Sequence, residues 1–332
     1  MRPNMRLLIG LAGVFSMALA CARAEAATPI AHCQAPAIVT PGSYVVTANL
    51  TNPNNAAPCI TVKALLVTIN LGGYVLIGKG AQVGILGSNF LTVTNGAIEA
   101  FATGISATGS NAVLSNVRII RSTGDGANLG NNARVTGSDF ILNGSPRGGG
   151  NGLGLGSNAV VSNCVFANNG VFGMGAEDGA TVTGSTSSSN GSHGFGMALA
   201  TMIANTASDN GGSGFVAGPG SVFKGNAATG NTTGAYDVTQ SVLIGNSAYG
   251  NPGVGFSDGK WSTFQDNTAN FNGSAGFVTN GQSTFIGNTS SNNAAGFNVA
   301  CPTNLVGNTS QSNTNNFLHS GVGCNISNNV GF

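Results

Sequence analysis

A repeat of 20 or 21 residues dominates this sequence and restricts the folds that it can adopt. A glycine followed by an apolar residue returns in steps of 21, 21, 20, 20, 21, 21 and 20 between residues 152 and 296. The glycines of this series are Gly152, Gly173, Gly194, Gly214, Gly234, Gly255, Gly276 and Gly296. A fixed period of this length indicates a solenoid, in which each repeat packs only on its neighbours.

Asparagine recurs with the same period in two further series. The first consists of Asn205, Asn226, Asn246, Asn267, Asn288 and Asn308. The second consists of Asn190, Asn210, Asn231, Asn251, Asn272, Asn292 and Asn313. Gly, Asn, Ser and Thr fill these units, and all four are poor in helix interiors, so helical solenoids are excluded.

Short alternating runs such as 241–244 and 283–286 predict strands of about 3 to 5 residues. Three such strands with their corners use about 20 residues, and each coil stacks on the next at about 4.8 Å. The sequence therefore predicts an all-β parallel β-helix. Gly and Asn suit corners with positive φ, and stacked Asn side chains can hydrogen-bond along a column. Phe195, Phe215, Phe256, Phe277 and Phe297 predict an inner column, interrupted at Ala235, where Tyr236 or Leu243 fills the space.

The turn at 41–44, the strand at 69–74 and the Gly-Phe and Asn columns resemble one known group of proteins. They are similar to the bacterial right-handed parallel β-helix repeat proteins of the pectin-lyase-like group. The resemblance covers residues 36–332 and implies a single-stranded right-handed solenoid of about 20–21 residues per coil. It implies no particular reaction, because the group includes lyases, hydrolases, epimerases and adhesins.

The first residues predict export. Arg2 and Arg6 precede an apolar stretch at 7–20 and small residues at 24–26, which is the pattern of a signal peptide over residues 1–26. A β-helix domain over 27–332 then forms the mature chain, without a transmembrane segment. The run ending at Cys21 offers an alternative, a lipoprotein processed at that cysteine. In both cases we expect a periplasmic, extracellular or cell-surface protein.

Cysteine spacing agrees with an oxidising compartment. Cys33 with Cys59, and Cys301 with Cys324, are the expected disulfides, which leaves Cys164 free. Charged residues make up only 6% of the chain and the net charge is +1. Nucleic-acid binding is therefore excluded, because it needs clustered Lys and Arg.

Two carboxylates are the weak candidates for catalysis. Asp237 and Asp258 each follow their coil's glycine by three residues, which predicts that they stack about 5 Å apart on adjacent coils. That separation suits a retaining glycosidase. Tyr236, Lys260 and Trp261 lie close by in sequence and are the candidate carbohydrate-binding residues. The competing interpretation is that each Asp caps a turn.

The other ionisable residues give weaker evidence for a catalytic or metal site. His193 lies in a Ser-His-Gly triplet like that of polygalacturonases, but no Arg follows residue 194, so the rest of that motif is missing. Arg118 and Arg121 are expected to be solvated strand residues. The three histidines, His32, His193 and His319, lack ligand spacing, so we expect no metal site and no cofactor.

Two classes of function remain. The first is an exported β-helix with a structural, surface or carbohydrate-binding role and no catalytic machinery, favoured by the shortage of ionisable residues. The alternative is a polysaccharide lyase or glycoside hydrolase. The partner expected in both cases is a polysaccharide or a cell-surface glycan.

Overall fold

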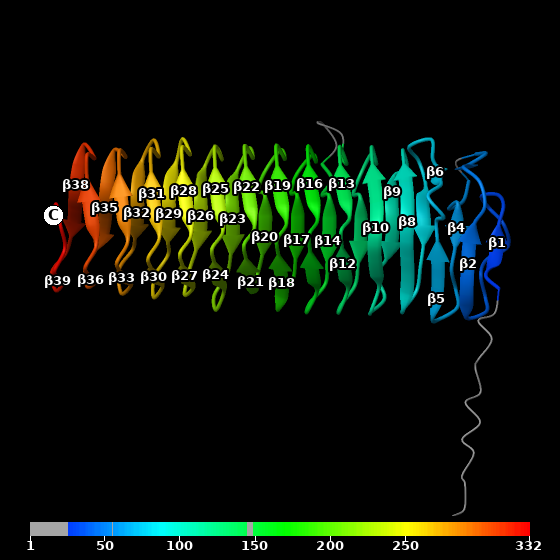
Figure 1. Ribbon diagram of the computed structural model, residues 1–332, viewed down its shortest axis with the longest axis horizontal. Coiled ribbons are helices and arrows are strands. Elements are labelled where there is room, and N and C mark those ends of the chain that lie inside the picture. Colours follow the sequence, from blue (N-terminus) through cyan, green and yellow to red (C-terminus); the bar gives the residue numbers. More distant parts are fainter. Residues whose placement is uncertain (1–25, 55, 145–148) are drawn as a thin grey trace, which may run out of the picture.

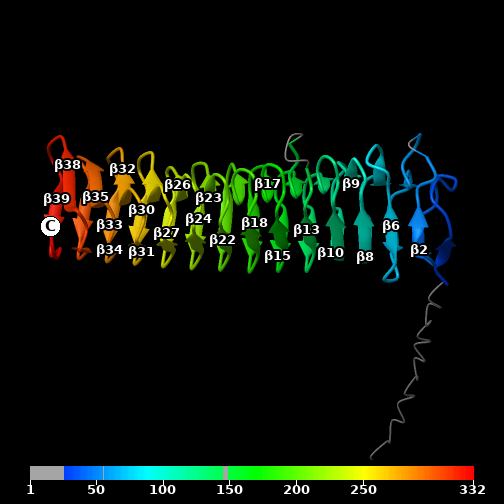
Figure 2. The same cartoon turned by 90° about the horizontal axis from the view of Figure 1, so that it is seen from above.

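The computed structural model describes residues 26–54, 56–144 and 149–332. Cys21 and residues 1–25 of the predicted signal peptide lie outside the described residues. The chain winds into a rod of stacked three-strand coils, with β1 near one end and β39 at the other (Figure 1). A view from above shows the same rod (Figure 2). All elements of the described residues are β-strands, and every pairing between them joins parallel strands.

Each coil contributes a strand to each of three faces. The first face contains β1 (Thr28–Ile30), β2 (Gly42–Val46), β5 (Val67–Asn70), β8 (Leu91–Glu99), β10 (Val113–Ile120), β12 (Arg134–Thr136), β15 (Val160–Ser162), β18 (Ala180–Thr183), β21 (Ala200–Ile203), β24 (Val222–Lys224), β27 (Val242–Ile244), β30 (Thr263–Gln265), β33 (Thr284–Ile286), β36 (Asn304–Val306) and β39 (Asn325–Ser327). The second face contains β3 (Leu50–Thr51), β6 (Val75–Ile77), β13 (Asp139–Ile141), β16 (Val165–Ala167), β19 (Thr186–Ser188), β22 (Thr206–Ser208), β25 (Ala227–Thr229), β28 (Ser247–Tyr249), β31 (Thr268–Asn270), β34 (Thr289–Ser291) and β37 (Thr309–Gln311). The long strands β8 and β10 pair on both faces and join them into one 26-stranded sheet.

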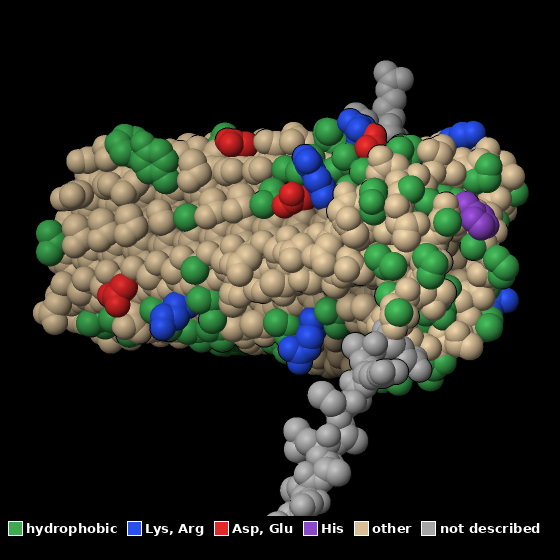
Figure 3. Space-filling view, turned by 45° about the vertical axis from the view of Figure 1, so that its right-hand side comes forward, with side chains coloured by type: hydrophobic (Ala, Val, Ile, Leu, Met, Phe, Trp, Pro, Cys, Tyr) green, Lys and Arg blue, Asp and Glu red, His purple; other side chains and the backbone are tan. Residues whose placement is uncertain are grey.

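The third face is a separate sheet of 13 strands. It contains β4 (Ile60–Thr61), β7 (Val83–Leu86), β9 (Thr103–Ala107), β11 (Ala127–Leu129), β14 (Leu153–Leu155), β17 (Met174–Ala176), β20 (Phe195–Met197), β23 (Ser213–Ala217), β26 (Gly234–Val238), β29 (Val254–Asp258), β32 (Ala275–Thr279), β35 (Ala295–Ala300) and β38 (Asn315–Ser320). The predicted parallel solenoid is confirmed. Charged side chains are sparse on the surface seen in Figure 3.

Aromatic rings stack inside the third face. The rings of Phe215, Tyr236 and Phe256 lie parallel, with centroids 5.0 and 4.6 Å apart. The predicted column is thus continuous, and Tyr236 fills the gap. The expected place of Gly234 in the glycine series is wrong. Gly234 pairs with Ser213 and Val254, so Ala235 stands where the other coils have the column glycine. Burying each ring contributes roughly 2 to 3 kcal/mol.

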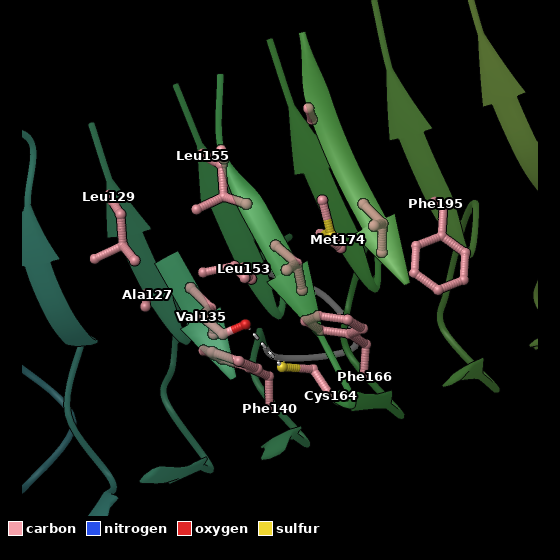
Figure 4. Packing of buried hydrophobic residues seen from close by; sticks show 14 of the residues in the cluster. Ala127, Leu129, Val135, Phe140, Leu153, Leu155, Cys164, Phe166, Met174 and Phe195 are labelled. Carbon is pink, nitrogen blue, oxygen red and sulfur yellow. Dashed lines mark hydrogen bonds between the residues drawn. The ribbon is translucent and has the colours of Figure 1, made fainter. Parts of the chain in front are cut away.

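Large and small residues exchange places along the core. Phe140 and Phe166 point inward from the second face, where the third face holds Ala127 and Leu153 (Figure 4). From β20 onward the third face supplies rings, together with Phe223, Phe264 and Phe285 of the first face. From β19 onward the second face supplies small residues: Ser187, Ala207, Ala228, Ala248, Ala269, Ser290 and Ser310. The exchange keeps the core filled, because close packing requires a large residue opposite a small one.

Two asparagine ladders line the corners of the second face. Within each ladder, Nδ2 of one Asn donates to Oδ1 of the Asn on the next coil, as from Asn246 to Asn267 at 3.0 Å. The same oxygen accepts the backbone N–H of Asn246 at 2.9 Å. Positive φ occurs at the residue before the ladder rather than at the ladder Asn, which corrects the expectation that one Asn serves both purposes. Asn292 accordingly has φ 57°, and Asn293 is the ladder residue.

Both expected disulfides are confirmed. Cys33 is bonded to Cys59 near the N-terminal end of the rod, and Cys301 to Cys324 near the C-terminal end. Cys164 is free and buried. No helix among the described residues has the length and apolar character needed to cross a membrane.

Candidate functional site

The predicted carboxylate pair does not form. Asp237 pairs with Ser257, and Asp258 pairs with Val238, so the two acids are one residue out of register. Because neighbouring side chains on a strand point to opposite sides, Asp237 is exposed and Asp258 is buried at 2% exposure. The pair fails because the glycine series slips by one residue at Gly234.

Asp258 is instead surrounded by three side-chain hydroxyl groups. Its carboxyl oxygens accept hydrogen bonds from Ser262 Oγ at 2.6 Å, from Thr279 Oγ1 at 2.9 Å and from Ser283 Oγ. A buried carboxyl group needs such donors to offset the loss of water. This contact set explains Asp258 as a core residue that joins two coils.

Tyr236 lies in the core rather than at the surface, which corrects its expected role in carbohydrate binding. The phenol donates to the carbonyl of Asn226 at 2.8 Å. Burial raises the pKa of the Tyr236 phenol well above its ordinary value. Its ring contacts other rings on both sides, so no surface remains for a ligand.

Lys260 and Trp261 lie at the corner that follows β29. The ammonium group of Lys260 is 5.9 Å from the centre of the Trp261 ring, and the Trp261 side chain is 57% exposed. Trp261 thus remains an exposed aromatic residue. It lies beside the third face, not on its outward strand surface.

Asp237 borders two shallow depressions on the third face. One, of about 390 Å³, is lined by Gly218, Thr239 and Gly259 among others. The second, of about 190 Å³, is lined by His193, Ser213 and Thr233 among others. Asp237 and Ser257 line both, so the two depressions meet at these side chains.

Three glycines in register form a flat strip beside these depressions. Gly154, Gly175 and Gly196 occupy the outward position of β14, β17 and β20 and pair with one another directly. A Cβ atom on Gly175 or Gly196 would meet nothing closer than 3.7 Å. The fold therefore does not require glycine at Gly175 and Gly196, although glycine weakens a strand. At Gly154 a Cβ would lie 2.6 Å from Asn128 Oδ1, so that side chain would have to move. We call these three residues the glycine strip.

A second glycine column on the same strands differs in this respect. A Cβ on Gly194 would lie 2.7 Å from the carbonyl oxygen of Gly214 and 2.9 Å from Asn210 Nδ2. Packing against the asparagine ladder demands glycine at this position. The comparison distinguishes Gly175 and Gly196, which are half-buried and have free space above them. Glycine in a strand can mark a bulge or the close approach of a ligand or another backbone.

Two stacked rings flank the glycine strip. Phe172 and His193 stand in the same register on adjacent coils, with ring centroids 5.4 Å apart and planes inclined by 24°. The Nδ1 atom of His193 accepts the backbone N–H of Ser213 at 2.8 Å, which places the proton of the neutral ring on Nε2. Both side chains are half-buried, so a ligand on the strip can contact their ring surfaces.

The same column continues with polar residues toward the N-terminal end. Asn151 Oδ1 accepts the backbone N–H of Phe172 at 3.2 Å. Asp125 Oδ1 accepts the N–H of Asn151 at 2.7 Å, and its other oxygen accepts from Asn128 Nδ2 at 2.8 Å. These contacts hold the side chains of the column in fixed orientations.

Arg118 and Arg121 are both exposed, as expected for solvated residues. Arg118 is exposed on β10 and pairs with Asp139, whereas Arg121 forms an ion pair with Glu99. A depression of about 750 Å³ lies beside Arg121, Leu142 and Asn168. In the described part of the chain, no three His, Cys, Asp or Glu side chains are grouped as ligands for a metal ion.

Comparison with known proteins agrees with the architecture. Residues 75–202 match the family model described as the right handed beta helix region. The chain is a right-handed parallel β-helix with a pectin-lyase-like fold. It superposes on the periplasmic alginate epimerase AlgG with a TM-score of 0.56 and 14% identity, covering 86% of this chain and 76% of AlgG.

The A-module of the Azotobacter vinelandii mannuronan C-5 epimerase AlgE6 gives a TM-score of 0.48 at 15% identity, over 87% of this β-helix and 88% of the module. No curated protein sequence matches significantly. At these identities the likeness concerns the fold alone.

Proposed function

We propose that this protein is an exported, non-catalytic β-helix that binds an extended polysaccharide along the third face. The ligand lies over the glycine strip and the depressions at Asp237, from β14 to β29. Two disulfides support export, because such bonds persist in oxidising compartments. The signal sequence at 1–26, or its lipoprotein alternative at Cys21, supplies the route.

The observation that carries the proposal is the glycine strip beside the Phe172–His193 stack. Sugar rings present a flat apolar side that packs on aromatic rings, and a strip without side chains lets a polymer approach the strand backbone. Ring and strip repeat from coil to coil at about 4.8 Å, roughly the length of one sugar unit. Polar groups at His193 Nε2, Asp237 and Ser257 are available to sugar hydroxyls.

Binding fits the site better than catalysis. A retaining hydrolase needs two carboxyl groups about 5 Å apart, and the only such pair expected from the sequence is divided between surface and core. His193 and Asp237 lie two coils apart, about 10 Å along the sheet, which is too far for direct proton transfer. The fold also supports a glycan ligand in general terms, since AlgG is an alginate epimerase.

Removal of the ring at Phe172 tests the proposal. The mature chain is applied to an array of cellulose, mannan, xylan, chitin and polyuronate oligosaccharides, and the reducing ends released are measured in parallel. Phe172→Ala is expected to weaken binding about 10-fold or more, because stacked rings contribute about 1 kcal/mol each beyond their area. Phe90→Ala removes an exposed ring far from the strip and serves as the control.

Three results separate the alternatives. Equal loss in both variants would place binding elsewhere. Absence of binding to every glycan would refute the proposed function. Reducing ends released by the wild-type protein would favour the lyase or hydrolase class, and Asp237→Asn would then test that side chain.

A further inference from the structure

We infer that the glycan bound by the third face carries no carboxylate groups, in contrast to the alginate named for AlgG. The inference rests on the proposed function and concerns the class of polymer. It follows from the charges that line the outward surface of the third face.

Three outward columns form that surface, and parallel pairing fixes their members. The central column includes the glycine strip, Val216, Asp237 and Ser257. The flanking column on one side includes Asp125, Asn151, Phe172, His193 and Ser213. The column on the other side follows the central one by two residues and includes Glu177, Ala198, Gly218 and Thr239.

No Lys or Arg occupies these columns between β7 and β38 in the part of the chain that the structure describes. Lys63, two residues after the end of β4, continues the second flanking column one coil before β7. Lys260 lies at the corner after β29 with its ammonium group over Trp261. Arg118, Arg134 and Lys224 point outward from the first and second faces. Among the described residues, a polyuronate that runs from β14 to β29 would therefore meet no Lys or Arg in these three columns.

Acidic side chains occupy the same surface. Asp125 already accepts hydrogen bonds from Asn128 and Asn151, and Glu177 accepts one from Ser157 at 3.1 Å. Asp237 is exposed where the two depressions meet. The described residues contain a single ion pair, Arg121 with Glu99, so none of these three carboxylates is neutralised by a salt bridge.

Like charges that face each other across an interface oppose binding, and the effect grows where water is displaced. A polyuronate carries one carboxylate per sugar and would bring several of them near Asp125, Glu177 and Asp237. An uncharged sugar meets no such repulsion, and its hydroxyls can donate to these same oxygens. The third face thus favours neutral or amino-bearing polymers over acidic ones.

Measured affinities test this inference. Dissociation constants of the mature chain are determined for cello-, manno-, xylo- and chitooligosaccharides, and for oligomers of alginate and polygalacturonate. Binding of at least one non-acidic polymer is expected to be about 10-fold tighter than binding of either polyuronate at physiological salt. The double variant E177K/D237K is expected to gain polyuronate binding about 10-fold or more, with a gain that shrinks as salt rises.

The control variant D209K/D266K also replaces two acidic residues by lysine, so it changes the net charge by the same amount. Both of these acids are exposed at corners outside the third face. Tighter binding of a polyuronate than of every non-acidic polymer by the wild-type protein would overturn the inference and leave the proposed function standing. An equal gain in both double variants would also overturn it, because charge would then act without regard to position. Failure to bind any glycan would refute both proposals.

Discussion

The N-terminal and C-terminal parts of this β-helix differ in the residues that fill the core and form the corners. In the coils up to β10, aliphatic residues such as Ile69, Val93 and Ile105 fill the core, and long strands such as β8 and β10 pass a corner without a break. The strands after β10 are shorter, and from β20 onward rings stack inside the third face and asparagine ladders occupy two corners. Irregular aliphatic packing tolerates variable coils, whereas aligned rings and amides demand a constant repeat.

The boundary between the two regions coincides with the candidate site. The large residues move from the second face to the third between Phe166 and Phe195, whose rings meet edge to face at 6.0 Å. The glycine strip and the Phe172–His193 stack lie on the outer surface of these same coils. A surface specialised for a ligand therefore sits where the core is neither purely aliphatic nor purely aromatic.

The largest expected effect comes from opening the ring stack. Phe256→Ala is expected to cost about 4 kcal/mol of unfolding free energy, because Tyr236 and Phe277 stack on both sides of its ring and the asparagine ladders fix the coil spacing, so the cavity cannot close. Ile105→Ala, in a column that already contains Ala127, is expected to cost only about 2 to 3 kcal/mol. Chemical denaturation of both variants makes the comparison. Equal or reversed losses would show that the ring stack is no more rigid than the aliphatic core.

A smaller effect is expected from interrupting an asparagine ladder. Asn267→Ala removes the acceptor of the Asn246 side chain and backbone N–H groups, both buried, and the cost is expected to be about 3 kcal/mol. The matched change in the first region is Asn116→Gly, since Asn116 is exposed, has a φ of 53° and donates to Asn95 at 3.5 Å. It is expected to cost no more than about 0.5 kcal/mol. Similar losses of unfolding free energy in urea titrations of the two variants would mean that the ladder does not stabilise the fold.

The comparison of regions also explains what the sequence could predict. The period and the parallel solenoid follow from spacing, because identical environments recur on every coil, and both disulfides follow from the positions of the cysteines. The role of Tyr236 followed only in part, because the sequence left Tyr236 and Leu243 open as the residue that fills the ring column and also suggested Tyr236 as a surface residue for carbohydrate binding. Individual registers do not follow so easily. Coils of 20 and 21 residues alternate, and a slip of one residue moves a side chain from core to surface, as Asp237 and Asp258 show.

The glycine strip was not identified from the sequence, for a different reason. Glycine accounts for 53 of 332 residues, and the inner column at Gly173 and Gly194 has the same period as the strip. Only the free space around the Cβ positions of Gly175 and Gly196 distinguishes the strip from the inner column. The signal in the sequence is the triplet Gly-apolar-Gly at 152–154, 173–175 and 194–196, which later coils replace by Gly-Phe-Val, Gly-Phe-Ser or Gly-Phe-Asn.

The smallest effect is expected where the ladder of the first corner begins. Cys164 stands between Ser138 and Ser185 in the column that becomes asparagine at Asn205, and its backbone N–H donates to Ser185 Oγ at 3.2 Å. Burial raises the pKa of the Cys164 thiol to about 11. The folded chain therefore holds this proton more tightly than the unfolded chain, in which the ordinary value is 9.0.

Stability that depends on the protonated thiol is complete below about pH 9 and is lost as pH rises toward about 11. Cys164→Ser should fit the column, because serine already occupies it on both sides, and it lacks a group that titrates in this range. Between about pH 8 and pH 10.5 the wild-type protein is expected to lose roughly 2 kcal/mol more unfolding free energy than the variant. Tyr236 is present in both proteins, so its own raised pKa cancels in the difference. Parallel pH dependence of the two proteins in denaturant titrations would show that the thiol is hydrated, and the ladder would then begin in an open corner rather than a closed one.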